Sequence, residues 1–248
     1  MIKFFRKIRQ RLLSENKFSK YFIYAIGEIV LVVIGILIAL QINNWNEGNK
    51  QRAKEVDLVN ALILDLDLKL NENISDLEIG EQIIERCNKV KFDVQAGMLV
   101  DTSNVKDILD GLASDEWFYV TNTPTYNSIV NSGLWQRLPD SLARTVQSIY
   151  DGRAAALSLG FQKHNEYATN CKLNYLAPKG LLNLDQNALS LSKKISEDVE
   201  AFQVQLDIYM NGVQRMIRLN TISKNRIEEV IPHLYSYRNR LANNKVRQ

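Results

Sequence analysis

The sequence predicts an all-α protein in which one N-terminal transmembrane helix continues into a bundle of long helices outside the cytoplasm. Three observations support this fold class. Residues 21–43 form an apolar run with one charged residue, YFIYAIGEIVLVVIGILIALQIN. Four prolines and eleven glycines in 248 residues are too few for a many-stranded sandwich, which needs a turn signal about every 8–12 residues. Beyond the apolar run, hydrophobic residues recur every three or four positions, as on the buried face of a helix.

The apolar run is long enough to cross a bilayer. As a helix its 23 residues would extend about 34 Å, at about 1.5 Å per residue, and the hydrocarbon core is about 30 Å thick. Between Ile29 and Leu40 every face of the helix is apolar, which favours a membrane span over an amphipathic core helix. Tyr21, Tyr24 and Trp45 lie near its two ends, where aromatic rings favour the headgroup region. We therefore predict a basic cytoplasmic tail at 1–20, a transmembrane helix at 21–43 and an outer helical domain at 44–248.

The distribution of charge predicts the orientation. Residues 1–20 contain seven basic residues and one acidic residue, whereas Lys50, Arg52 and Lys54 alone follow the span closely. The positive-inside rule then places the N-terminus in the cytoplasm. Because no A-x-A-like cleavage site follows Leu40, we expect an uncleaved signal anchor. The rest of the chain has a net charge of −3, so no nucleic-acid-binding surface is expected.

One face of the predicted span carries small residues. At 100° per residue, Glu28, Gly35 and Ala39 lie within about 20° of one line along the helix. Gly35-x-x-x-Ala39 is a small-xxx-small pair, which lets a second helix approach closely. One hypothesis is therefore that this face packs against another copy or another membrane protein, with Glu28 protonated or paired there. The alternative is that Glu28 lies near the inner headgroups and that the helix contacts lipid alone.

The outer domain begins with a long helix that is expected to continue from Trp45. Its apolar residues follow a three-four spacing, typical of the seam of a bundle or coiled-coil helix, and Asn73 and Gly80 interrupt them. These seam positions are Val56, Val59, Ile63, Leu66, Leu70, Leu77, Ile84 and Cys87. Residues 62–70 also alternate with period two, as in a strand. The helical periodicity on both sides and the absence of turn residues favour a helix.

The later segments are also predicted to be helical, with one extended or irregular piece. They are a connection at 97–104, a short helix at 105–112, a loop or extended piece at 114–125, a helix ended by Gly133, a helix that starts near Pro139 and extends to about Leu176, and a final helix at about 189–231 that Pro232 interrupts or kinks.

Few residues suggest chemistry. Cys87 and Cys171 would form a disulfide in an oxidising compartment, or they are two buried thiols. Two cysteines and two histidines at these spacings do not make a zinc site. His164 and Glu166 point to different sides of a helix, as do Asp65 and Asp67, so neither pair forms an acid–base couple. We expect no metal, no cofactor and no enzymatic activity.

An aromatic group is the strongest candidate for a contact surface. It comprises Trp117, Phe118, Tyr119, Tyr126 and Trp135. Aromatic side chains contribute much of the energy of interfaces, but they also build cores. A core role is the alternative for these five residues.

The span and its flanks resemble a known family. The segment GEIVLVVIGILIALQINNWNE follows the basic stretch FFRKIRQRLLSENKFSKY, and both resemble a family of bacterial single-span membrane proteins known only as a domain of unknown function. TYNSIVNSGLWQRLPDSLARTVQSIYD resembles the second recognisable stretch of that family. The resemblance implies a Gram-negative inner-membrane protein with a periplasmic helical domain, and it supplies no activity. Type IV pilins also have an apolar helix after a glutamate, but their glycine lies five residues earlier, where this chain has Ile23.

These expectations favour a non-enzymatic scaffold or interaction protein that is anchored in the membrane. It would hold helical surfaces at a fixed height above the bilayer. The alternative is a ligand-binding sensory module, since helical bundles bind small molecules between their helices. Because a cytoplasmic tail of about 20 residues is too short for an output domain, such a module would signal through a partner.

Overall fold

The computed structural model describes residues 18–98, 102–113, 124–183 and 187–243. These residues are helical, with turns between the helices and no strand among them, which confirms the all-α prediction for this part of the chain. The helices are α2 (Phe18–Gln95), α3 (Thr102–Ala113), α4 (Pro124–Asn131), the 3₁₀ helix η1 (Leu134–Arg137), α5 (Asp140–Gln147), the π-helix η2 (Ser148–Arg153), α6 (Ala154–Cys171), the π-helix η3 (Lys172–Leu176), α7 (Ala188–Ser196) and α8 (Val199–Asn243). The chain divides into two compact units, Met1–Val56 with Ala242–Gln248, and Asp57–Leu241.

The first unit contains the predicted span. In the part of the chain that the structure describes, α2 is the one helix long and apolar enough to cross a membrane, by its length and composition. Its most apolar 18-residue window has a mean hydropathy of 2.7, and none of that window is buried. Large side chains such as Leu31 and Leu37 are 69% and 58% exposed. An exposed apolar surface of this extent suits a lipid environment.

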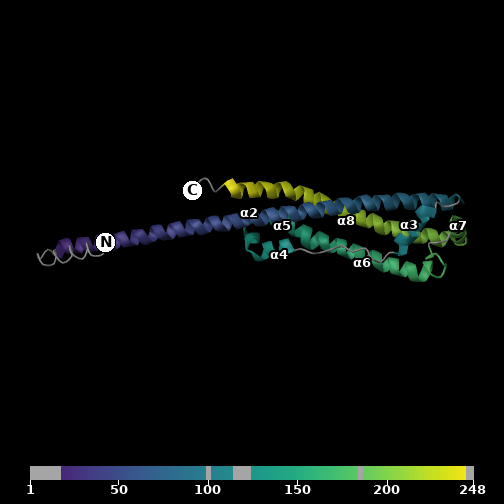
Figure 1. The fold of residues 1–248 in the computed structure, drawn as a ribbon, viewed down its shortest axis with the longest axis horizontal. Coiled ribbons are helices and arrows are strands. Elements are labelled where there is room, and N and C mark those ends of the chain that lie inside the picture. The colour runs from purple at the N-terminus through teal and green to yellow at the C-terminus, as the bar shows by residue number, and fades with distance from the viewer. Residues whose placement is uncertain (1–17, 99–101, 114–123, 184–186, 244–248) are drawn as a thin grey trace. The chain divides into compact units, whose positions relative to one another are not determined.

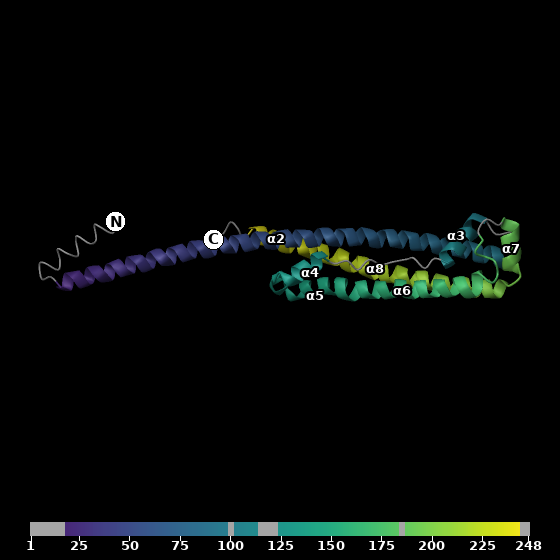
Figure 2. The ribbon, with the colours of Figure 1, turned by 60° about the horizontal axis from the view of Figure 1, so that its bottom comes forward.

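The second unit has two main hydrophobic core clusters. The Tyr150 cluster joins buried residues of α2, α4, α5, η2 and α8, among them Leu66, Tyr126, Val146, Tyr150 and Ile227. The Phe202 cluster joins buried residues of α2, α3, α6, η3, α7 and α8, among them Cys87, Leu109, Cys171, Leu191 and Phe202. Figures 1 and 2 both show α8 alongside α2 in this unit, with α6 next to α8. Each long helix therefore buries one face against the others.

The buried positions of α2 and α8 repeat with spacings of three and four residues. On α8 they include Leu206, Tyr209, Val213, Met216, Asn220, Ser223, Ile227, Val230 and Leu234. On α2 the seam includes the two residues that were expected to interrupt it, Asn73 and Gly80, and both are buried. Asn73 donates a hydrogen bond from Nδ2 to Ser223 Oγ at 2.9 Å. A Cβ atom at Gly80 would lie 2.8 Å from Ile217 Cγ1, so the glycine permits close packing of α8.

The helical stretch from α5 to η3 ends where the sequence predicts. α5, η2, α6 and η3 follow one another without a gap from Asp140 to Leu176, and Pro139 precedes the first turn. Gly133, the predicted helix end, has φ +77°, a conformation that glycine adopts without strain. The two π-helical segments were not predicted. Each contains one or more wider turns, which are frequent at functional sites.

The prediction of one final helix from 189 to 231 is wrong in two respects. The helix breaks after α7, because Asp198 accepts a hydrogen bond from the backbone N–H of Ala201 and so caps the start of α8. Asp198 also pairs with Lys179 at 2.6 Å, which fixes the corner. Pro232 lies inside α8, which continues to Asn243. An interior proline costs about 3 kcal/mol, and the burial of Val230 and Leu234 on its two sides offsets that cost.

Candidate functional site

A group of polar and aromatic contacts in the second unit surrounds Tyr150. Its hydroxyl donates a hydrogen bond to Asp65 Oδ2 on α2, and its ring stacks on Tyr126 at a centroid distance of 4.5 Å and an angle of 7°. Tyr126 donates its own hydroxyl to Asp151 Oδ2 at 3.0 Å. The Trp135 ring meets Tyr126 edge-on at 5.6 Å, and Lys69 Nζ lies 5.5 Å from the centre of the Tyr150 ring. We call these six residues the tyrosine site.

Local structure explains how the tyrosine site forms. Tyr150 and Asp151 are consecutive residues of η2, and the π-helical turn widens the helix so that both reach α4 and α2. Tyr126 lies in the first turn of α4, two residues after Pro124, which is suited to a helix start. Asp65 lies next to the seam residue Leu66 on α2, at the edge of the buried face.

The chemistry of the tyrosine site is that of a packed core. Burial, with a further contribution from the hydrogen bond to Asp151, raises the pKa of Tyr126 to about 12. Tyr126 therefore remains a hydrogen-bond donor at neutral pH. Stacked rings and hydroxyl–carboxylate hydrogen bonds fix the relative positions of α2, α4 and η2. This arrangement suits mechanical rigidity better than proton transfer.

A second group of polar residues lies on the seam between α2 and α8. Asn73 and Ser223 pair there, and the Asn220 amide donates a hydrogen bond to the half-buried carboxyl of Asp76. Burial, followed by repulsion from Glu72, raises the pKa of Asp76 above its ordinary value of 3.8, and the bond from Asn220 opposes this. Within the residues that the structure describes, Oδ1 of Asn220 is buried and accepts no hydrogen bond.

The Asp76→Asn variant is expected to be more stable than the wild type at neutral pH. The new amide would keep the contact with Asn220 and could also donate to its unsatisfied Oδ1, so the free energy of unfolding should rise by about 1 kcal/mol. A carboxyl whose pKa is raised on folding lowers stability as the pH rises from 3.8 through the folded pKa. The gain should therefore be larger at pH 7 than at pH 4 in urea denaturation of the full chain.

The control for this prediction is Glu78→Gln. Glu78 is exposed on α2, two residues from Asp76, and the variant removes the same charge. It should change stability by less than about 0.5 kcal/mol. If Glu78→Gln and Asp76→Asn shift the urea midpoint equally at pH 7, then general charge reduction, and not the buried carboxyl, explains the gain.

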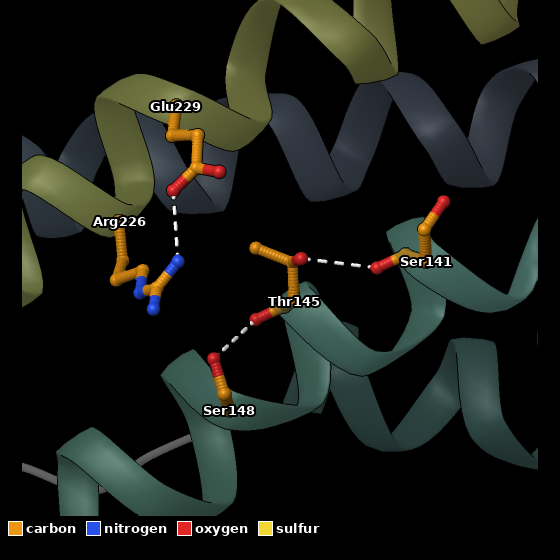
Figure 3. A network of polar contacts seen from close by, with 5 residues as sticks. All are labelled: Ser141, Thr145, Ser148, Arg226 and Glu229. Carbon is orange, nitrogen blue, oxygen red and sulfur yellow. Dashed lines mark hydrogen bonds and ion pairs between the residues drawn. The ribbon is translucent and has the colours of Figure 1, made fainter.

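Among the described residues of the second unit, three of the grooves have linings that bear on function. The first lies between α5 and α8, has a volume of about 250 Å³ and is lined by Ser141, Thr145, Glu229, His233 and Arg240, among others. Figure 3 shows the polar contacts beside it: Thr145 donates to the Ser141 carbonyl at 3.0 Å, Ser148 donates to the Thr145 carbonyl at 2.8 Å, and Arg226 pairs with Glu229 at 2.9 Å. The first two contacts lie within α5 and η2, and the third lies within α8. None of the three contacts crosses the groove from one wall to the other.

The other two grooves differ in character. One, of about 410 Å³, lies between the end of α2 and α7 and has a largely apolar lining that includes Val94, Met98, Leu189, Ile195 and Val199. The other, of about 250 Å³, lies between α6 and α8 and has a basic rim. Among the described residues, no group of three or more His, Cys, Asp or Glu side chains could hold a metal ion.

The structure places the predicted aromatic residues as follows. Trp117, Phe118 and Tyr119 lie outside the described residues. Tyr126 is 7% exposed and belongs to the Tyr150 cluster, against which the half-buried Trp135 packs. These two residues therefore belong to the core, the alternative that the sequence left open, and sequence reasoning missed their partner Tyr150.

The other predicted residues are not brought together with the tyrosine site. Cys87 and Cys171 are both buried free thiols in the Phe202 cluster, and burial raises the pKa of Cys87 to about 12. On α2, a side chain added at Gly35 would meet no atom within 4 Å, so the face of Glu28, Gly35 and Ala39 is open to a second helix.

Comparison with known proteins gives a family and no activity. No curated protein and no solved structure matches the chain. A family model described as a family of unknown function matches residues 28–199, which extend from the apolar segment of α2 to the first residue of α8. Because this match covers more than half of the 248 residues, the chain belongs to that family of unknown function, DUF6090.

Proposed function

We propose that this protein is a membrane-anchored scaffold that holds partner proteins at the bacterial inner membrane, with its N-terminus in the cytoplasm and its helical unit in the periplasm. One observation carries the proposal: the same chain contains an apolar segment of membrane-spanning length, none of whose most apolar window is buried, and a separate compact helical unit. The basic tail at 1–20 supports the orientation, because positively charged flanks remain on the cytoplasmic side.

The interior of the helical unit supports a structural role. The buried hydroxyls of Tyr126 and Tyr150 are used in hydrogen bonds to Asp151 and Asp65, and the Asn73 amide is used with Ser223. Paired polar groups inside a core fix one arrangement of the helices, since a different register would leave them unpaired. A unit with a fixed register presents a constant outer surface, as a scaffold requires.

The face of Glu28, Gly35 and Ala39 is the proposed contact with a second membrane helix. In this proposal it binds another copy of the chain or a different membrane protein. A glycine and an alanine four residues apart allow helix backbones to approach closely, and interhelical hydrogen bonds add to the packing.

The test is photo-crosslinking in native membranes. A crosslinking amino acid is placed at position 35 in one variant and at position 33 in the control, which lies about 200° around the helix. We expect a discrete crosslinked product from position 35 and little from position 33, and mass spectrometry would identify it as a second copy or another protein. Equal products from both positions, or none from position 35, would contradict the proposed face.

A ligand-binding sensory module is the second candidate, and the apolar groove between α2 and α7 favours it. Its volume of about 410 Å³ lies within the range of small-molecule sites, about 300–1,000 Å³. Native mass spectrometry of the purified full chain would detect a bound small molecule. The Val199→Trp variant, which fills the groove, should lose it. A wild-type protein without any added mass would argue against this candidate.

A further inference from the structure

The groove between α6 and α8 is built from matching positions of the two helices. α6 contributes Gly160, Lys163, His164 and Tyr167, and α8 contributes Ile208, Asn211, Gly212 and Arg215. In each helix these residues are spaced at i, i+3, i+4 and i+7, so one face of each helix forms a wall. A Cβ atom at Gly160 would lie 3.2 Å from Leu219 Cδ1 and one at Gly212 would lie 3.5 Å from His164 Nδ1, so glycine at both positions lets α6 and α8 pack closely beneath the groove.

The rim of this groove is positively charged. Lys163 and Arg215 are exposed on opposite walls, and no acidic residue is among the lining residues. Within the part of the chain that the structure describes, neither cation forms an ion pair. The nearby acids have partners of their own, since Glu166 accepts a hydrogen bond from Gln162 and Asp207 pairs with Lys91 at 2.6 Å.

The floor and walls of the groove are fixed by contacts inside the protein. His164 is 6% exposed, and its ring lies 5.5 Å from that of Tyr209. Tyr167 donates its hydroxyl to the Gln205 carbonyl at 2.8 Å. Asn211 offers an amide at the wall. The groove is therefore preorganised, with two exposed cations at the rim of a polar base that contacts inside the protein hold in place.

We infer that this groove binds a compact oxyanion, a phosphate or carboxylate group, between Lys163 and Arg215. Guanidinium and ammonium groups are the common ligands of both anions, and their hydrogen bonds to an anion are about twice as strong as neutral ones. The groove has a volume of about 250 Å³, so a small anion fits between its two walls. The inference does not depend on the scaffold proposal.

The test measures binding of two probes to the detergent-solubilised full chain by titration calorimetry at low salt. Inorganic phosphate and succinate are the probes, and the tighter of the two identifies the chemical class. The Arg215→Gln variant should weaken binding about tenfold, and Lys163→Gln gives the same test from the opposite wall. Both side chains are exposed, so neither change should unfold the protein.

Two further variants separate the groove from general electrostatics. Arg218→Gln removes the same charge from an exposed position of α8, three residues away and outside the lining, so it should leave binding within about twofold of the wild type. Gly212→Ala adds a methyl group 3.5 Å from His164 Nδ1, an ordinary contact that narrows the groove without changing charge, so binding should weaken. Absence of binding of both probes to the wild type, or equal losses in Arg215→Gln and Arg218→Gln, would overturn the inference.

Discussion

Replacing Leu31 and Leu37 together with arginine is expected to release the protein from the membrane. Both side chains lie in the apolar segment of α2 and are 69% and 58% exposed. An arginine at the centre of a membrane helix costs about 2.5–3.5 kcal/mol on insertion scales, so two of them cost about 6 kcal/mol. Alkaline carbonate washing of membranes should leave the wild type in the pellet and move most of the double variant to the supernatant.

The matched control uses the same substitution outside the predicted span. Leu64 and Leu68 are also leucines of α2, each 65% exposed, and they belong to the second unit. Leu64→Arg with Leu68→Arg adds the same two charges, so it should leave the protein in the membrane pellet. If both double variants remain in the pellet, then the apolar segment does not anchor the protein, and the scaffold proposal loses its basis.

Periodicity in the sequence was sufficient for the long helices. The alternation at residues 62–70 suggested a strand, yet the structure has α2 there, with Leu62, Ile63 and Leu66 buried and Leu64 and Leu68 exposed. Helical spacing over several turns therefore outweighs a short period-two pattern. The end of the helical stretch α5–η3 at Leu176 was also predicted, because Pro178 follows within two residues.

Residues whose role depends on a distant partner were harder to predict. Asn73 and Gly80 look like interruptions when only α2 is considered, and they become seam positions because Ser223 and Ile217 of α8 face them. Pro232 looks like a helix end because proline lacks the backbone donor, but the buried residues on both sides hold α8 together. The sequence signal for a continuous helix was the spacing of three and four residues between buried positions, which is kept on both sides of Asn73, Gly80 and Pro232.

The candidate sites show the same limit. Tyr126 and Trp135 could be recognised as an aromatic group, but Tyr150 and Asp65 are 85 residues apart in sequence and meet through the fold alone. The sequence also does not predict the α6–α8 groove, because it places only Glu166, on the same helix, near the polar floor residue His164. Its actual neighbours, Gly212 and Tyr209, come from α8.

Tyr150→Ala is expected to have the largest effect on the stability of the helical unit. The side chain is 4% exposed, stacks on Tyr126 and donates to Asp65, so its removal leaves a cavity and an unpaired carboxylate. Truncation of a buried aromatic residue costs about 3–5 kcal/mol. Tyr150→Phe keeps the ring and loses only the hydroxyl, which should cost about 1.5–3 kcal/mol, the usual value for a hydrogen bond to a charged group.

Tyr235→Ala is the matched control, because it removes a tyrosine side chain that lies outside the tyrosine site. Tyr235 is 39% exposed, and the Arg238 guanidinium lies 4.8 Å from the centre of its ring, so the variant should lose less than about 1 kcal/mol. Each kcal/mol lowers the Tm of a domain of this size by roughly 2–4 °C, measured by near-UV circular dichroism of the detergent-solubilised full chain. We expect Tyr235→Ala to have the highest Tm of the three variants, Tyr150→Phe an intermediate Tm and Tyr150→Ala the lowest. A Tyr150→Ala protein as stable as Tyr235→Ala would show that the tyrosine site does not hold α2, α4 and η2 together, and the rigid unit that a scaffold needs would then have to depend on the Phe202 cluster.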